Sequence, residues 1–176
     1  MKSAVLVIDM TNDFLTGSLK NDRALKTIQP IKELLGRAHQ QTVPVIYVSD
    51  AHYKEDHEFK IWGQHSMKGT WGGQITEELA PTGEDYTFEK RTYSAFFQTG
   101  LDSLLRDLQV DNVILTGVVT NICIQHSAAD ACFRGYEITI PKETTEALND
   151  DDYEYALNYV QNMYGAKITS LSDTLN

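Results

Sequence analysis

The sequence predicts an α/β fold in three layers: a doubly wound, Rossmann-like sheet of six mainly parallel strands with helices on both faces. Short, almost continuous apolar runs are typical of parallel strands that are buried on both faces. Amphipathic segments alternate with these runs, and this alternation favours right-handed crossovers between parallel strands. The chain has 176 residues without an internal repeat or a low-complexity linker, so we expect a single domain over residues 1–176.

Six segments are expected as strands. Each is short, rich in apolar or β-branched residues, and bounded by polar or turn-forming residues. The expected strands span residues 4–8, 43–48, 86–88, 112–116, 137–140 and 167–169. The first of them does not indicate a signal peptide, because its apolar run is only about five residues long and lacks a small-residue cleavage site.

Four segments carry apolar side chains at helical spacing and are expected as helices. They span residues 24–40, 101–108, 121–134 and 152–163. Pro30 lies inside the first of them and marks either an interruption or a restart of that helix. Gly135 follows the third and is a typical helix stop.

One long segment fits neither pattern. Residues 49–73 are rich in His, Trp, Asp and Gly and poor in periodic apolar residues. Structureless loops of about 25 residues are uncommon in compact domains unless they are functional. We therefore expect this loop to contribute to a functional site.

The net charge excludes two classes of partner. The sequence has 15 Lys and Arg against 25 Asp and Glu, which gives a formal net charge of −10 at pH 7. Such a chain repels phosphate backbones and anionic lipids, so neither nucleic acid nor a membrane surface is expected as a partner. No run approaches the roughly 20 apolar residues of a membrane-spanning helix. The composition is that of a soluble globular chain.

The two cysteines are expected to be free thiols. Cys123 and Cys132 lie within one predicted helix, where their side chains are too far apart for a disulfide bond. Reduced thiols are typical of the cytoplasm, so we expect a cytoplasmic location.

Reactive residues follow four of the expected strands. Asp9, Asp50 and Lys90 each come after an apolar run, and Cys123 opens the helix after the fourth run. Doubly wound folds bind ligands at the carboxyl ends of their strands, so these four side chains are expected at one rim. Taken singly, each has an ordinary explanation: an Asp that caps a turn, a solvated Lys, a small core Cys.

A thiol, a carboxylate and an ammonium together form a chemically useful set. A thiol with a pKa of about 8.5 is mostly protonated at neutral pH, and a helix N-terminus and a nearby Lys both favour the thiolate. We expect Lys90 to hold Cys123 as the thiolate in this way. Asp9 would take the thiol proton and later donate it to a departing amine. Backbone N–H groups around residues 119–123 would stabilise a developing oxyanion.

Three motifs follow one another along the chain: VLVIDMTNDF, FEKRTYSAF and GVVTNICIQHSAADA. Together they resemble the isochorismatase-like cysteine hydrolases, the superfamily of nicotinamidases and N-carbamoylsarcosine amidases, over nearly the whole chain. The resemblance implies a catalytic triad of Asp9, Lys90 and Cys123. It also implies a non-proline cis peptide bond between Val118 and Val119, which turns backbone N–H groups towards the oxyanion beside Cys123.

Part of the long loop, SDAHYKEDHEFKIWGQHSMKGT, resembles the metal-binding loop of the nicotinamidase branch. The resemblance implies that Asp50, His52 and His65 bind a divalent metal, with Glu58 or its rival His57 completing the site. Histidine and carboxylate ligands suit Zn first, with Mn or Fe as alternatives. The resemblance further implies that the metal orients the substrate through a ring nitrogen. The alternative is that these are surface histidines of a loop.

Phe14 and Trp62 match family positions that wall the substrate pocket. Flat apolar walls suit an aromatic amide. The alternative role of both residues is ordinary core packing.

The resemblance implies a cysteine-dependent amidohydrolase that acts on a small amide through a thioester, with nicotinamide, converted to nicotinate and ammonia, as the first candidate substrate. Hydrolysis of an N-carbamoyl compound is the alternative, because the loop also resembles that of N-carbamoylsarcosine amidases. Isochorismate hydrolysis is less well supported because it needs no nucleophilic cysteine. A non-catalytic metal- or ligand-binding relative would not require Asp9, Lys90 and Cys123 together. We also expect a homo-oligomer, either a dimer or a tetramer.

Overall fold

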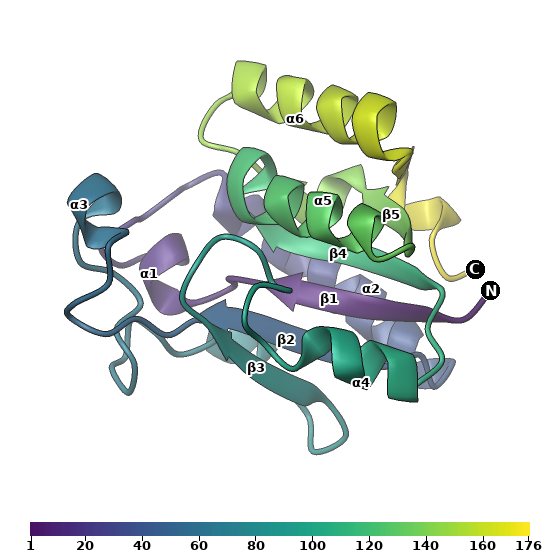
Figure 1. Cartoon of the computed structure of the whole chain (residues 1–176), viewed down its shortest axis with the longest axis horizontal. Helices are drawn as coiled ribbons and strands as arrows, with labels where there is room; N and C mark the ends of the chain where they lie inside the picture. Colours follow the sequence, from purple (N-terminus) through teal and green to yellow (C-terminus); the bar gives the residue numbers. More distant parts are fainter.

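A sheet of seven strands forms the middle layer of the computed structural model, which describes residues 1–176 (Figure 1). Its strands are β1 (Ser3–Ile8), β2 (Val45–Asp50), β3 (Tyr86–Lys90), β4 (Asn112–Val118), β5 (Glu137–Pro141), β6 (Thr145–Glu146) and β7 (Lys167–Thr169). Six of them follow the order β3-β2-β1-β4-β5-β7, and β6 pairs with the end of β4. All these pairings are parallel, which confirms the predicted fold class.

Helices cover both faces of this sheet. They are α1 (Asn12–Leu15), α2 (Ile28–Gln40), α3 (Phe59–Trp62), α4 (Leu101–Asp107), α5 (Gln125–Phe133) and α6 (Asp150–Tyr164). In Figure 1, α4 and α5 lie in front of the sheet and α2 lies behind it. Because successive strand residues point to opposite faces, Leu6 and Ile8 of β1 join the core that includes α4 and α5, whereas Val5 and Val7 join the core that includes α2.

The winding of the chain reverses between β1 and β4, which lie side by side. From β1 the chain continues outward through β2 and β3, and it returns through α4 to β4 on the other side of β1. The carboxyl end of β1 points towards α1 and α3, whereas both chain termini lie at the opposite end (Figure 1). Ligands of doubly wound folds bind outside the strand ends at such a reversal. The ends of β1 and β4 are therefore where a site is expected.

Several boundaries differ from the predictions. β3 continues to Lys90 rather than to residue 88, and β4 continues to Val118 rather than to residue 116. The prediction of six strands missed β6, because a strand of two residues carries no readable pattern. The single-turn helices α1 and α3 have four residues each and are too short to show helical periodicity.

The ends of two predicted helices have clear local causes. The first helix starts with a 3₁₀ turn at Ala24–Thr27 and then continues as α2. Pro30 lies in the first turn of α2, where its missing N–H is tolerated, so it marks a restart. At the start of α6, the side chain of Asn149 accepts a hydrogen bond of 2.8 Å from the backbone N–H of Asp152. Gly165 ends α6 with a left-handed φ of 68°.

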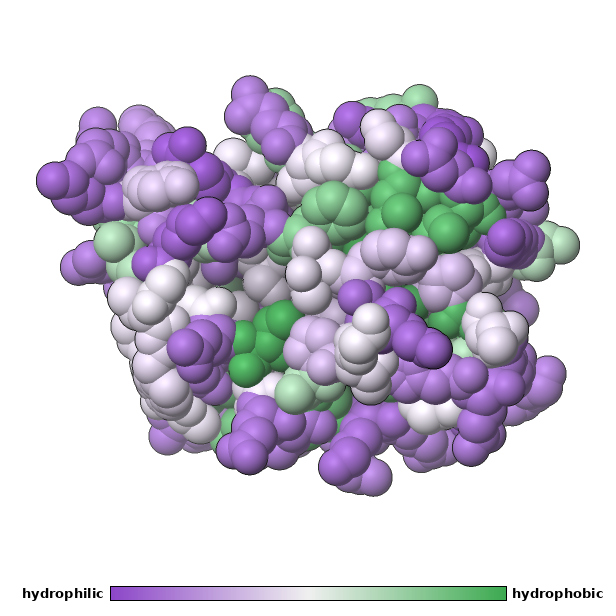
Figure 2. Space-filling view, turned by 90° about the horizontal axis from the view of Figure 1, so that it is seen from below, coloured by the Kyte–Doolittle hydropathy of each residue, from purple (hydrophilic) through white to green (hydrophobic).

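β3 forms an edge of the sheet and lies at the bottom of Figure 1, together with α4. Figure 2 views the molecule from below: hydrophilic side chains, in purple, enclose smaller hydrophobic patches, in green. Glu89 of β3 forms an ion pair with Lys68, and charged side chains on an edge strand disfavour pairing with another chain. None of the helices combines the length and the apolar character needed to cross a membrane.

Gly117 allows the close approach of β4 to β1 beside the site. Its backbone has a φ of 107°, in a region that favours glycine. A Cβ atom at this position would lie 1.9 Å from the carbonyl oxygen of Ile8, the residue that pairs with Gly117 in the sheet. A side chain here therefore forces apart the two strands whose ends carry Asp9 and the Val118–Val119 bond.

We predict that Gly117→Ala lowers the free energy of unfolding by about 2–4 kcal/mol, because it adds backbone strain to a clash with the neighbouring strand. Urea unfolding measures this loss. Gly36→Ala is the control, since Gly36 lies within α2 and a Cβ there meets no atom within 4 Å. The control is expected to raise stability by about 0.5–1 kcal/mol, and equal effects of the two substitutions would contradict the role given to Gly117.

Candidate active site

Lys90 lies at the centre of a buried polar group at the ends of the strands. Its Nζ is 2.8 Å from Asp9 Oδ2, 2.5 Å from Asp50 Oδ1 and 3.7 Å from Cys123 Sγ. The same Nζ donates a hydrogen bond of 2.9 Å to the carbonyl oxygen of Thr92. Asp9, Asp50, Lys90 and Cys123 are all buried, and none of them is more than 3% exposed. The structure thus brings together the four side chains expected at one rim: the three predicted catalytic residues and Asp50.

Neighbouring strand ends position these four residues. Asp9 directly follows β1 with a φ of 55°, a conformation that Asp tolerates better than most residues. Its Oδ1 accepts a hydrogen bond of 2.8 Å from the backbone N–H of Asp50. Asp50 and Lys90 are register partners at the ends of β2 and β3. Cys123 lies in the π-helical turn Thr120–Ile124, which leads from β4 into α5.

The ionisable groups of this cluster influence one another strongly. Burial and the charge of Asp50 raise the pKa of Asp9 to about 6, although Lys90 opposes the rise. Burial also disfavours ionised Asp50, but Lys90 and His52 outweigh it and lower the pKa of that carboxyl. Burial disfavours charged Lys90 as well, yet the two carboxylates hold its pKa well above the usual value. At neutral pH the cluster therefore contains one ammonium and two mainly ionised carboxylates.

The surroundings of Cys123 favour its thiol form, against the thiolate expected from the sequence. Burial raises the pKa of Cys123 well above its ordinary value, and the charges of Asp9 and Asp50 add to the rise. Lys90 lowers this pKa, as expected, but does not offset burial and two negative charges. The sequence reveals the cation but not the depth of burial. Asp9 is thus the group beside the thiol that is able to accept its proton.

The turn before Cys123 contains an unusual peptide bond. The bond between Val118 and Val119 is cis, as the resemblance implied. Val118, Val119 and Cys123 all line one cavity, so the turn forms part of its wall. The role of their backbone N–H groups in holding an oxyanion stays a prediction.

This cavity has a volume of about 370 Å³ and nine hydrophobic residues among its 14 lining residues. Phe14 and Trp62 are two of them. Phe14 also belongs to the core that includes α2, so this residue both lines the cavity and packs in the core. The Nε1 of Trp62 donates a hydrogen bond of 3.0 Å to the hydroxyl of Tyr93, which lines the cavity as well. Lys20 is the one Lys or Arg in the lining. Sequence reasoning missed Tyr93 and Lys20, because neither stands at a strand end.

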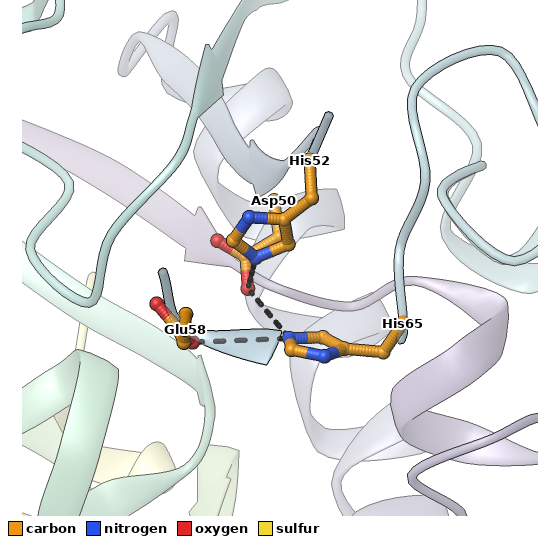
Figure 3. A group of neighbouring side chains, drawn as sticks. All are labelled: Asp50, His52, Glu58 and His65. Atoms are coloured by element: carbon orange, nitrogen blue, oxygen red, sulfur yellow. Dashed lines mark ion pairs between the residues drawn. The ribbon is translucent and has the colours of Figure 1, made fainter. Parts of the chain in front are cut away.

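Asp50, His52, Glu58 and His65 form a second group beside the first (Figure 3). Asp50 Oδ2 is 3.4 Å from His52 Nε2 and 3.8 Å from His65 Nε2, and Glu58 Oε1 is 3.8 Å from His65 Nε2. One oxygen or nitrogen atom from each of the four residues lies within 4.8 Å of all the others. Asp50 therefore belongs to both groups, since its other oxygen contacts Lys90.

The donor set of this second group fits a divalent cation. The Nε2 atoms of His52 and His65 are buried and have no hydrogen-bond partner, which is costly unless a further group satisfies them. Two imidazoles and two carboxylates are the ligand types that zinc, manganese and iron accept. Glu58 points into the group, whereas the rival His57 is exposed and lies outside it. The geometry favours Glu58 as the fourth ligand.

Fold and site together define a doubly wound α/β protein with a buried thiol, carboxylate and ammonium at the strand ends, next to a metal-compatible group. The family described as the isochorismatase domain matches residues 3–173. The chain therefore belongs to the isochorismatase family and is an isochorismatase-family hydrolase.

Relatives with similar sequences and structures cover almost the whole chain. An uncharacterised isochorismatase family protein of Bacillus subtilis is 35% identical over 95% of this chain and 93% of its own length. The crystal structure of N-carbamoylsarcosine amidase from Thermoplasma acidophilum matches with a TM-score of 0.93 and 38% identity, covering 98% of each chain. The nicotinamidase/pyrazinamidase PncA of Bacillus subtilis matches with a TM-score of 0.91 and 30% identity, covering 97% of this chain and 100% of that one.

We predict that Lys90→Met lowers the free energy of unfolding by about 3–5 kcal/mol, because it leaves two buried carboxylates without a counter-charge. Urea unfolding at neutral pH measures the loss. Lys26→Met, at an exposed position, is the matched control and is expected to change stability by less than about 0.5 kcal/mol. A Lys90→Met protein as stable as the control would show that the buried carboxylates do not depend on this ammonium.

Proposed function

We propose that the chain is a cysteine-dependent amidohydrolase that converts a small amide, nicotinamide first, into its acid and ammonia. One observation carries this proposal: a buried thiol, Cys123, and a carboxylate, Asp9, contact the same ammonium, Lys90, beside a mostly apolar cavity. A binding protein has no need of this combination. The walls formed by Phe14 and Trp62 suit the flat ring of an aromatic amide.

In the first half of the reaction, Cys123 Sγ attacks the amide carbonyl carbon while the thiol proton passes to Asp9. Because the thiol is protonated at rest, attack and proton transfer belong to one step, and Asp9 acts as general base. The tetrahedral intermediate then breaks its carbon–nitrogen bond. Asp9 returns the proton to the nitrogen, ammonia leaves, and a thioester with Cys123 remains.

In the second half, water attacks the thioester carbonyl carbon and gives a proton to Asp9. The carbon–sulfur bond breaks, the acid product forms, and the proton on Asp9 returns to Cys123 Sγ. Lys90 stays charged throughout and keeps the carboxylate of Asp9 in place at 2.8 Å. The enzyme ends in its starting state after hydrolysing one amide with one water molecule.

The proposal includes one divalent cation, zinc first and manganese or iron as alternatives, held by Asp50, His52, His65 and Glu58. When bound, the cation would supply a Lewis-acid contact for a lone pair of the substrate, such as that of a ring nitrogen. The two partnerless Nε2 atoms support this assignment. Glu58 also lines the cavity, so its carboxylate belongs to both the ligand set and the substrate wall.

A homo-oligomer in the cytoplasm completes the proposal. Cys123 and Cys132 are both free, which suits a reducing compartment. Phe133 and Met163 are 75% and 61% exposed, and a second copy of the chain would cover such apolar side chains.

A second candidate function is the hydrolysis of an N-carbamoyl compound, in which the same thiol attacks the ureido carbonyl carbon and ammonia leaves. One observation favours it: Lys20 is the single cation of the cavity wall in a chain with a net charge of −10. An ammonium at that place suits a substrate with a carboxylate, and an N-carbamoyl amino acid carries one whereas nicotinamide does not.

The two candidates are tested by ammonia release from a panel of nicotinamide, pyrazinamide and N-carbamoylsarcosine. We predict that Cys123→Ala releases no ammonia above background from any of them, while its far-ultraviolet circular dichroism matches that of the wild type. Cys132→Ala is the matched control and is expected to keep activity. Turnover by Cys123→Ala would refute covalent catalysis at this thiol, and a higher kcat/KM for N-carbamoylsarcosine than for nicotinamide would select the second candidate.

We predict that the purified protein, after reconstitution with zinc and gel filtration, retains about one zinc ion per chain. His52→Ala is expected to lose stoichiometric zinc, since it removes one of two nitrogen ligands. His39→Ala is the control, because His39 lies on α2 and pairs with Asp85 outside the group. Elemental analysis by plasma mass spectrometry decides the matter: a wild-type protein without bound metal would refute the proposed site.

A further inference from the structure

The Nδ1 atoms of both histidines in the metal group are held by oxygen acceptors. His65 Nδ1 is 2.8 Å from the carbonyl oxygen of Gly63, and His52 Nδ1 is 2.9 Å from Asp56 Oδ2. A carbonyl and an ionised carboxylate only accept hydrogen bonds, so each Nδ1 carries the ring proton. Each Nε2 then directs a lone pair into the group. Figure 3 marks with dashed lines the contacts that these two Nε2 atoms make with Asp50 Oδ2.

Asp56 is a buried and fully engaged acceptor. Its side chain is 4% exposed. The Nε of Arg91 lies 3.1 Å from Asp56 Oδ1 and 3.2 Å from Oδ2, and Arg91 Nη2 also bonds to Oδ1. The backbone N–H of Tyr53 donates to Oδ2 at 3.1 Å. This set of donors fixes the carboxylate in its ionised form and aims Oδ2 at His52.

Arg91 is itself held in place by the strand and the loop. It directly follows Lys90, the last residue of β3. Its guanidinium carbon lies 5.0 Å from the centre of the Tyr53 ring, a cation–π contact. The backbone N–H of Ala51 donates to the carbonyl oxygen of Lys90 at 2.9 Å, which joins the start of the loop to the same strand end. The chain of contacts thus runs from β3 through Arg91 and Asp56 to His52.

We infer that Asp56 and Arg91 are positioning residues that select the Nδ1-protonated form of His52 and fix its ring, so that Nε2 is presented as a metal ligand. This inference rests on the metal site proposed above. Asp56 acts directly on His52, and Arg91 acts through Asp56. Outer partners of metal-bound histidines typically change metal affinity about 10–100-fold when they are removed.

Four substitutions in the full-length chain test this inference through zinc affinity, measured by competition with a chromophoric chelator. Asp56→Ala is expected to raise the zinc Kd about 10–100-fold. Asp56→Asn keeps an oxygen that accepts from Nδ1, and Arg91→Gln keeps the carboxylate, so each is expected to raise the Kd by a smaller factor, about two- to tenfold. Glu55→Gln, at an exposed position in the same loop, is the matched control and is expected to leave the Kd unchanged.

A second measurement uses the metal-free protein. Long-range ¹H–¹⁵N correlation spectra report which ring nitrogen of His52 carries the proton. The wild type, Asp56→Asn and Glu55→Gln are expected to show protonated Nδ1, whereas Asp56→Ala is expected to shift the proton largely to Nε2. A structural role alone would lower stability without moving this proton.

Two results would overturn the inference: a neutral His52 ring protonated at Nε2 instead of Nδ1 in the metal-free wild type, or a folded Asp56→Ala protein with a zinc Kd within about twofold of the wild type. If Asp56→Ala does not fold, Asp56→Asn and Arg91→Gln carry the test, and an unchanged zinc Kd in both refutes it. If the wild type binds no zinc, the proposed metal site fails. The proton position in Asp56→Ala then still decides whether Asp56 orients His52.

Discussion

One buried ammonium, that of Lys90, is the interaction on which the site depends. Asp9 and Asp50 are almost completely removed from water, where an isolated carboxylate is strongly unfavourable and tends to become neutral. Lys90 lies within hydrogen-bonding distance of both and allows both to remain mainly ionised. The charges do not cancel completely, because two carboxylates face one ammonium. In the metal-free chain, burial of the thiol and this surplus of negative charge both raise the pKa of Cys123.

Asp50 ties the nucleophile to the metal-compatible group. Its Oδ1 contacts Lys90 at 2.5 Å, and its Oδ2 faces His52 at 3.4 Å. A substitution at this position would remove a ligand atom and a counter-charge at the same time. Effects of changes in the two groups are therefore not expected to add, since both sets of residues share one carboxylate.

The sequence predicts the parts of the site that strand ends determine, and misses those that loop packing determines. Asp9 and Lys90 could be found because buried parallel strands are readable and their carboxyl ends meet at one edge. The choice between Glu58 and His57 could not be made, because both lie in the loop before α3 and only the folded chain shows that His57 is exposed and Glu58 joins the group. The protonated state of Cys123 was also beyond the sequence, since it depends on the depth of burial reached only in the folded chain.

The end of β3 supplies one cation to each of two buried sites: Lys90 to the group around Cys123, and Arg91 to Asp56 beside His52. Lys90, the last residue of β3, reaches Asp9 and Asp50, while Arg91, in the bend that follows, reaches Asp56. Lys90 is fully enclosed, whereas the side chain of Arg91 is 56% exposed and its ion pair is screened by water. Loss of the first cation therefore leaves charges that no solvent can stabilise, but loss of the second leaves a carboxylate that water can reach. The arrangement around Cys123 therefore needs the charge of Lys90, whereas loss of Arg91 is expected to weaken the position of His52 only in part.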